Sequence, residues 1–99
     1  MLKISKEENG SELKLALEGR LDTVTAPDLE EQIKSGLDNV ETLIFDLAQL
    51  EYISSAGLRV LLSAQKIMNK QGNMIVRNVS EEVNEILEVT GFLDILTVE

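Results

Sequence analysis

The sequence predicts a single α/β domain over residues 1–99, in which helices pack on a mixed β-sheet of about five strands. Two observations support this prediction. Hydrophobic residues alternate with polar ones near the N-terminus, and later apolar runs are too short for helices, so both patterns indicate strands. The segments between them repeat hydrophobic residues every three or four positions, as amphipathic helices do. The expected order of elements is β-β-α-β-α-β-α-β.

The first two strands are expected to form a hairpin. Hydrophobic side chains recur at every second position on either side of residues 8–11: Leu2, Ile4, Leu13, Leu15 and Leu17. Within that connection, Asn9 and Gly10 can adopt the positive φ angles that tight hairpin turns require.

Residues 25–37 are predicted to form the first helix, since leucine or isoleucine recurs there at every fourth position. Thr25 is a candidate N-cap with Asp28 three residues later, and Pro27 suits a first turn. Residues 41–47 are predicted to form a central strand, because their continuous apolar run indicates burial on both faces.

The second helix is predicted to begin at Ser54 or Ser55 and to end at Gly72. Its buried face is expected to comprise Gly57, Val60, Leu61, Ala64, Ile67 and Met68. Its opposite face is expected to carry Arg59, Ser63, Lys66 and Lys70.

The remaining chain is expected to hold a short strand at residues 74–76, a third helix, and a final strand at residues 95–98. Ser80 is the candidate N-cap of that helix, and Gly91 suits a left-handed C-terminal cap. The buried stripe of the helix is expected to be Val83, Ile86 and Leu87.

The composition argues against several classes of function. Nine Lys and Arg residues stand against 18 Asp and Glu residues, and the net charge of -9 disfavours nucleic acids and anionic membranes as partners. No apolar stretch has the length of a membrane span or a secretory signal, and the absence of cysteine fits a cytoplasmic protein. Histidine, the commonest general base and metal ligand, is also absent. We therefore expect no catalytic activity, no metal site and no cofactor.

The most informative segment joins the central strand to the second helix. It places the hydroxyls of Ser54 and Ser55 at a helix N-terminus, where free N–H groups and the helix dipole favour an anion such as a serine-linked phosphate. On spacing alone, a purely structural interpretation is favoured, in which Ser54 caps the helix and Ser55 fills its first turn.

Four stretches occur in a distinctive order: Gly19-Arg20-Leu21-Asp22, Phe45-Asp46-Leu47, Tyr52-Ile53-Ser54-Ser55-Ala56-Gly57-Leu58 and Val89-Thr90-Gly91-Phe92. With them the chain resembles, over essentially its whole length, the STAS-domain anti-sigma-factor antagonists of bacteria. The resemblance implies a partner switch. The unmodified protein binds an anti-sigma factor that is also its serine kinase, and so frees a sigma factor. Phosphorylation of a serine before the helix breaks the complex, and a metal-dependent phosphatase of the PP2C type restores it.

Residue by residue, the resemblance places the phosphoacceptor at Ser55. Ser54 is the alternative, because it stands where the family commonly has an aspartate. Asp22 and Asp46 match acidic positions that lie near the acceptor in the family, and the alternative for each is a carboxylate that caps a loop or a strand end. A phosphate on Ser55 would add about -1.5 to -2 charges beside these acids and Glu51, and so expel the partner without refolding.

Partner contacts are expected at the residues around the serines and on the exposed face of the second helix: Asp22, Asp46, Ser54, Ser55, Gly57, Arg59, Ser63 and Lys66. The basic residues of that face form a cationic stripe on an anionic protein. The stripe is either a solvated helix surface or a docking surface that attracts acidic groups of the kinase.

Two other functions compete with the partner switch. In one, the domain is a non-catalytic scaffold or an accessory subunit of another signalling or transport assembly, and the serines are ordinary caps. In the other, it is a small hydrolase or nucleotide-using enzyme with Ser55 as nucleophile. The missing histidine and cysteine, and Ile53 where a nucleophile elbow requires glycine, disfavour the hydrolase.

Overall fold

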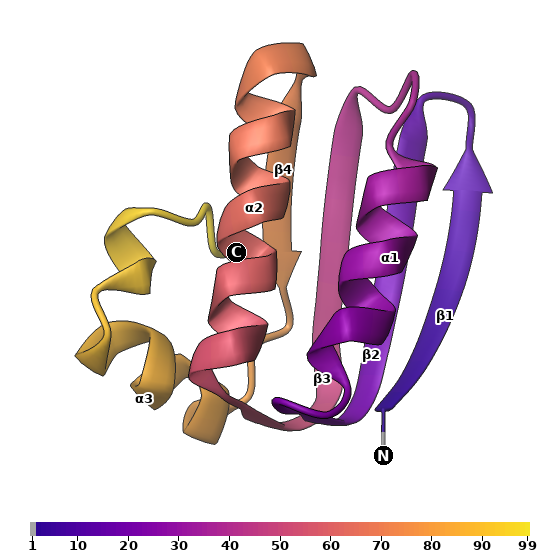
Figure 1. The fold of residues 1–99 in the computed structure, drawn as a ribbon. Helices are drawn as coiled ribbons and strands as arrows, with labels where there is room; N and C mark the ends of the chain where they lie inside the picture. The colour runs from indigo at the N-terminus through magenta and orange to yellow at the C-terminus, as the bar shows by residue number, and fades with distance from the viewer. Residues whose placement is uncertain (1) are drawn as a thin grey trace.

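The computed structural model describes residues 2–99 and confirms an α/β fold with a mixed sheet (Figure 1). The elements follow one another as β1 (Leu2–Asn9), β2 (Glu12–Leu21), α1 (Ala26–Gly36), β3 (Thr42–Ile53), α2 (Ser55–Gln71), β4 (Asn73–Arg77), α3 (Glu81–Val89) and the 3₁₀ helix η1 (Phe92–Asp94).

The sheet has the order β1-β2-β3-β4. β1 and β2 form the predicted antiparallel hairpin, and β2, β3 and β4 run parallel to one another. In Figure 1, α1 and α2 lie side by side over one face of the sheet, and α3 lies beside the lower part of α2. The carboxyl ends of β2 and β3 therefore meet at the same end of the molecule as the first turns of α1 and α2.

The core fills the space between the sheet and its helices. In β2 the predicted alternation is confirmed, because Leu13, Leu15 and Leu17 are each at most 2% exposed. β3 is the predicted central strand, with β2 on one side and β4 on the other, and its Phe45 is fully buried. The predicted buried face of α2 is also confirmed, except that Ile67 is only half-buried.

Serine side chains cap two helices, as the sequence predicts. The Ser54 Oγ accepts a hydrogen bond from the Gly57 N–H at the start of α2, at an N–O distance of 3.3 Å. The Ser80 Oγ accepts one from the Val83 N–H at the start of α3, also at 3.3 Å. Each bond satisfies one of the free amides of a first helical turn.

The predicted cap at Thr25 is wrong. Its backbone already has helical angles (φ -93°, ψ -20°), whereas a capping side chain reaches the first-turn amides from an extended backbone. The Thr25 hydroxyl instead donates to the carbonyl oxygen of Arg20 and accepts from the N–H of Asp22, both over 2.9 Å. Thr25 therefore fastens the β2–α1 loop and leaves α1 without a side-chain cap.

β3 extends further than residues 41–47. Its pairing with β2 shifts twice, and at each shift β3 has one residue more than β2: Ala16 and Glu18 pair with Asp46 and Gln49, and Gly19 and Arg20 pair with Leu50 and Tyr52. Such bulges bend a strand and disturb its alternation of side chains, so the second half of β3 had no recognisable strand pattern.

The predicted strand at residues 95–98 is reduced to a single parallel bridge between Val98 and Val76 of β4. After Gly91, which has the positive φ expected of it (80°), the chain turns into η1 and reaches the sheet edge only at its end. The hydrophobic pattern that predicted a strand has another cause here. Leu96 is 5% exposed and anchors the segment in the core, whereas Ile95 is 47% exposed.

Candidate functional site

The candidate site is the start of α2, where Ser54 is fixed by its backbone and its side chain. Its N–H donates to the carbonyl oxygen of Leu21 over 2.8 Å, and its Oγ accepts from Gly57. Its carbonyl oxygen accepts from the Leu58 N–H over 2.9 Å. The structural interpretation of Ser54 as a helix cap is therefore confirmed.

Ser55 differs from its neighbour. It is the first residue of α2 and is exposed, and its hydroxyl makes no hydrogen bond within residues 2–99. Of the two serines, Ser55 therefore offers the hydroxyl that another protein can reach without breaking the start of the helix.

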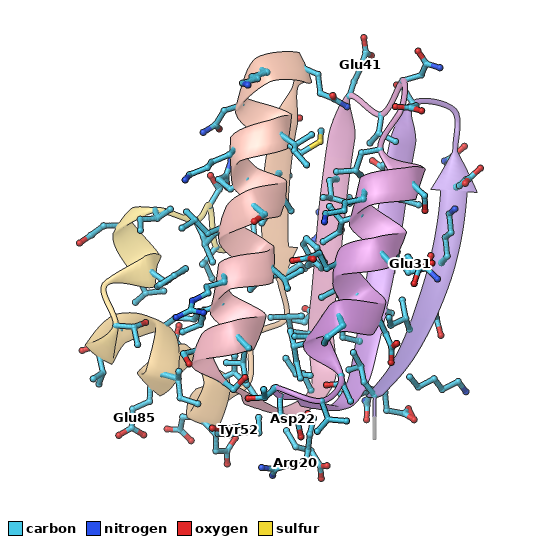
Figure 2. All side chains as sticks on the ribbon, viewed as in Figure 1. Arg20, Asp22, Glu31, Glu41, Tyr52 and Glu85 are labelled. Atoms are coloured by element: carbon cyan, nitrogen blue, oxygen red, sulfur yellow. The ribbon has the colours of Figure 1, made fainter. Side chains whose placement is uncertain are left out.

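Asp22 lies at the same end of the molecule, because it directly follows Leu21, to which Ser54 is bonded (Figure 2). The Asp22 Oδ1 accepts hydrogen bonds from the backbone N–H groups of Thr25 and Val24, each over 3.1 Å. These bonds, above all the one from Thr25, lower the pKa of Asp22. An ionised carboxylate thus closes the β2–α1 loop beside the serines.

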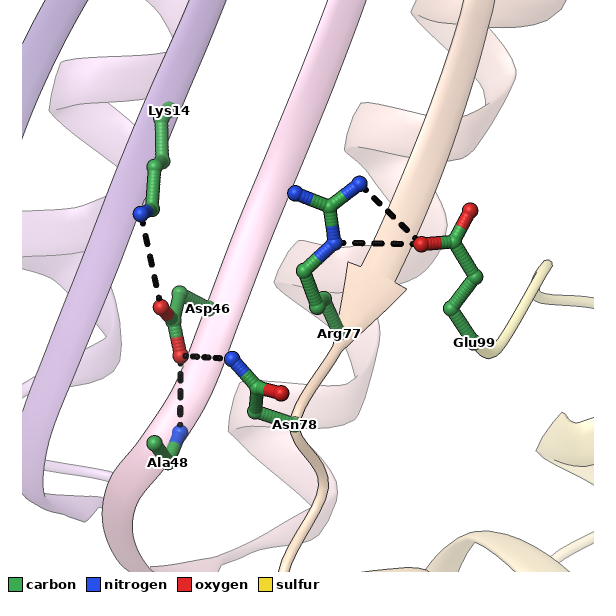
Figure 3. A network of polar contacts seen from close by, with 6 residues as sticks. All are labelled: Lys14, Asp46, Ala48, Arg77, Asn78 and Glu99. Atoms are coloured by element: carbon green, nitrogen blue, oxygen red, sulfur yellow. Dashed lines mark hydrogen bonds and ion pairs between the residues drawn. The ribbon is translucent and has the colours of Figure 1, made fainter.

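Asp46 does not join the serines, contrary to the expectation from the resemblance. It lies seven positions before the end of β3, roughly 20 Å along an extended strand. There its carboxylate accepts from the Ala48 N–H (3.0 Å) and from the side chain of Asn78 (3.3 Å), and pairs with Lys14 at 3.6 Å (Figure 3).

The network around Asp46 keeps it charged. Partial burial is the largest single influence and raises the pKa of Asp46, but the bonds from Ala48 and Asn78 and the charge of Lys14 together lower it below its ordinary value. The alternative of a locally satisfied strand carboxylate is thus confirmed. A phosphate on Ser55 would not meet this charge at close range.

Gly57, expected to contact a partner, is buried. A Cβ at this position would lie 2.7 Å from the Leu21 Cγ and 2.9 Å from the Ile53 Cγ1. Gly57 therefore allows the first turn of α2 to pack closely on the ends of β2 and β3.

A shallow groove of about 190 Å³ runs between the first turns of α1 and α2. It is lined by Thr23, Ala26, Pro27, Glu30, Ala56, Arg59 and Val60. Val24, in the adjoining loop, is 83% exposed. Neither the groove nor Val24 could be predicted from the sequence. A single hydrophobic residue in a turn belongs to no periodic pattern, and a groove between two helices can be predicted only when their relative placement is known.

The cationic stripe of α2 is exposed, as predicted. Arg59, Ser63, Lys66 and Lys70 all face solvent, and the ion pairs within residues 2–99 involve none of the three basic residues. Their charges are thus available to a partner. Another basic group lies at the end of the molecule that carries the start of α2, where the Arg20 guanidinium stacks 4.4 Å from the ring centroid of Tyr52 (Figure 2).

Within residues 2–99, no three carboxylates gather in a way that could hold a metal ion. Over the same residues, none of the helices combines the length and the apolar composition that crossing a membrane requires.

Comparisons with known proteins show the family and the fold. A family model for the STAS domain matches residues 3–99. BtrV of Bordetella bronchiseptica, named as a candidate anti-sigma factor antagonist, is 34% identical over 99 residues, which cover 98% of this chain and 85% of BtrV. The chain therefore belongs to the STAS domain family, and the predicted resemblance to its anti-sigma-factor antagonists is confirmed.

Solved structures share the fold. An anti-sigma factor antagonist from Mycobacterium paratuberculosis has a TM-score of 0.89 at 23% identity, covering 99% of this chain and 85% of its own. SpoIIAA, also an anti-sigma factor antagonist, is known in an unphosphorylated form (TM-score 0.84, 19% identity, 98% of this chain and 88% of its own). Its phosphorylated form, from Bacillus, has a TM-score of 0.77 at 18% identity, covering 98% and 91%.

Proposed function

We propose that this protein is a non-catalytic anti-sigma-factor antagonist whose partner binding is controlled by phosphorylation of Ser55. In its unmodified state it binds an anti-sigma factor that has serine kinase activity, and a sigma factor is released. Phosphorylation of Ser55 dissociates the complex, and a PP2C-type phosphatase regenerates the binding form. The switch operates in the cytoplasm, where ATP and sigma factors are present.

The observation that carries the proposal is the contrast between the two serines at the start of α2. The Ser54 Oγ is engaged as a cap, while the Ser55 hydroxyl is exposed and free of hydrogen bonds within residues 2–99. A kinase can therefore modify Ser55 without unfolding the helix. SpoIIAA, which shares this fold, is known in unphosphorylated and phosphorylated forms. This supports the proposal that the present protein is also phosphorylated on a serine.

The chemistry requires only a hydroxyl from this chain. The Oγ of Ser55 attacks the γ-phosphorus of ATP held by the partner, the bond to ADP breaks, and the hydroxyl proton passes to a base of the kinase. ATP and magnesium belong to the partner. This protein is the substrate.

The proposed docking surface surrounds Ser55 and comprises the groove between α1 and α2, the exposed side chain of Val24, and the cationic stripe of α2. Val24 and the groove offer apolar contact, and the stripe offers charge to an acidic partner surface. Phosphate on Ser55 places a dianion in the centre of this surface, beside the ionised Asp22. Burial of that charge against the partner would cost several kcal/mol, enough to release the partner.

The test is a pull-down from lysate of the source organism with four forms of the protein: wild type, Ser55→Ala, Ser55→Asp and Ser35→Asp. Ser35 is exposed near the far end of α1, so its variant carries the same added charge away from the docking surface. We expect an ATP-binding kinase to be retained by wild type, Ser55→Ala and Ser35→Asp, and to be lost with Ser55→Asp.

The retained kinase should then transfer phosphate from ATP to Ser55 of the wild-type protein, which peptide mass spectrometry locates. If Ser55→Asp retains the same proteins as Ser35→Asp, the switch is rejected. The protein would then be assigned a scaffold or accessory role, in which the α2 serines only build the helix start.

A further inference from the structure

Arg59 lies one helical turn beyond Ser55 on the exposed side of α2. The helix is continuous over Ser55–Gln71, so these side chains, four residues apart, are neighbours with their Cβ atoms about 5–6 Å apart. Both are exposed, whereas the intervening Gly57 and Leu58 are buried. The guanidinium of Arg59 is therefore within reach of a group attached to the Ser55 Oγ.

The charge of Arg59 is not used elsewhere in the described part of the chain. The ion pairs within residues 2–99 take their cations from Lys6, Lys14, Lys34 and Arg77. Glu30 of α1 lines the same groove as Arg59 but forms its ion pair with Lys34 instead, at 3.3 Å. An anion added to Ser55 thus meets a guanidinium without a competing carboxylate partner.

We propose that Arg59 is the intramolecular partner of a phosphate on Ser55, and that phosphorylation withdraws Arg59 from the docking surface. The inference rests on the proposed modification of Ser55. The guanidinium donates N–H groups to two phosphate oxygens in the planar geometry that arginine favours for oxyanions. The switch then acts twice, because it adds negative charge and removes the first cation of the stripe.

The other charged groups at this end of the molecule favour the same pairing. Asp22 in the β2–α1 loop and Glu30 on α1 repel a phosphate on Ser55, whereas Arg59, which lines the same groove as Glu30, attracts it. Two other cations lie near this end among the residues that the structure describes: Arg20, whose guanidinium is already stacked on Tyr52, and Lys3, which lies on the edge strand β1 and is separated from β3 by β2. The geometry therefore selects Arg59 over Arg20.

The test measures the second pKa of the phosphate by ³¹P NMR titration. Phosphoserine is installed at position 55 during translation, by expansion of the genetic code, so that no kinase is needed. Removal of a neighbouring cation disfavours the dianion, and Arg59→Gln should therefore raise the pKa of the phosphate by about half a unit, as expected of an exposed ion pair.

Lys66→Gln is the matched control. It removes the same charge from the same exposed helix face, but eleven residues from Ser55, about 16 Å along the axis and beyond the screening length at physiological salt. We expect a shift several-fold smaller than that of Arg59→Gln. Equal shifts in the two variants would overturn the proposal, since they would reflect net charge alone.

Arg20→Gln provides the third comparison. A larger shift for Arg20→Gln than for Arg59→Gln would assign the phosphate to Arg20 and likewise overturn the proposal. The titration involves no partner protein, so a failed pull-down does not affect it. Conversely, an unshifted pKa in Arg59→Gln would reject the role of Arg59 while the partner switch at Ser55 still stood on its own test.

Discussion

The backbone N–H of Ser54 donates to the carbonyl oxygen of Leu21 over 2.8 Å, which joins the ends of two parallel strands that each lead into a helix. Asp22 follows Leu21 and Ser55 follows Ser54, so the bond holds the acidic loop and the proposed phosphoacceptor in a fixed relation. The fold thereby presents the Ser55 hydroxyl at an exposed position, where the proposed modification would change the charge of the surface without a change of fold.

Ser54 and Ser55 should respond differently to removal of their hydroxyls. Ser54→Ala deletes the cap of α2 and should lower the free energy of unfolding by about 1 kcal/mol, as for other serine caps. Ser55→Ala removes an exposed hydroxyl and should change it by less than about 0.5 kcal/mol. Urea denaturation of both variants measures the difference, and equal effects would contradict the structural division between the two serines.

Gly72 should not tolerate a side chain. A Cβ there would overlap the carbonyl oxygen of Glu41, because the chain after α2 passes against the backbone that leads into β3. The backbone would have to move, and we expect Gly72→Ala to lower the free energy of unfolding by about 2 kcal/mol. Gly36→Ala is the control, since the nearest atom to its new Cβ is the Lys6 Nζ at 3.8 Å. Thermal unfolding that shifts equally in both variants would contradict this account.

Local patterns predicted those parts of the fold that local chemistry determines. The alternation of Leu13, Leu15 and Leu17 follows from one buried sheet face, and the caps at Ser54 and Ser80 follow from the free amides of a helix start. The resemblance correctly brought Asp22 and Ser55 to one end of the molecule. These features depend on residues close in sequence or on the shared topology of the family.

The parts that could not be predicted depend on register and on contacts between distant residues. Asp46 lies well before the end of β3, because the strand contains two bulges and continues to Ile53. Its charge is stabilised by Lys14 and Asn78, which come from other parts of the chain. The hydrophobic residues at 95–98 fit the pattern of a strand, although the segment forms only one bridge to the sheet. Leu96 is buried in the core after the turn at η1, and this contact cannot be predicted from the local pattern.

The charge of Asp46 should contribute to stability in a pH-dependent way. Its folded-state pKa lies below the unfolded value near 4, so folding favours the ionised form. The contribution is complete above the unfolded pKa and is lost as the pH falls through the folded pKa. Since Lys14 is 36% exposed and the pair is screened, Asp46→Asn should cost less than about 1 kcal/mol at pH 7.

Urea denaturation over a series of falling pH values from pH 7 measures this contribution of Asp46. The difference between wild type and Asp46→Asn should shrink as the pH falls, and it should vanish once Asp46 is protonated in the folded state as well. Glu31→Gln is the matched control, because it removes a carboxylate at an exposed position of α1 outside the ion pairs of residues 2–99. A constant difference across the pH range would contradict an electrostatic role for Asp46.

The C-terminal segment should be held by Leu96 more than by its visible ion pair. Arg77 binds the Glu99 Oε1 through its Nε (3.1 Å) and Nη2 (3.0 Å), but the two side chains are 38% and 53% exposed (Figure 3). Solvent and salt screen such a pair, so Arg77→Gln should cost less than about 1 kcal/mol. Leu96 is 5% exposed within the core, and Leu96→Ala should cost about 2 to 3 kcal/mol through lost burial and a residual cavity.

Denaturant unfolding of the two variants ranks these contributions, and hydrogen exchange at the Val76 and Glu99 amides reports whether the bridge to β4 opens. We expect Leu96→Ala to accelerate exchange at both amides, because each donates a hydrogen bond of the bridge. Arg77→Gln should leave that exchange nearly unchanged. The reverse ranking would mean that the ion pair, and not the buried leucine, holds the C-terminal segment against β4.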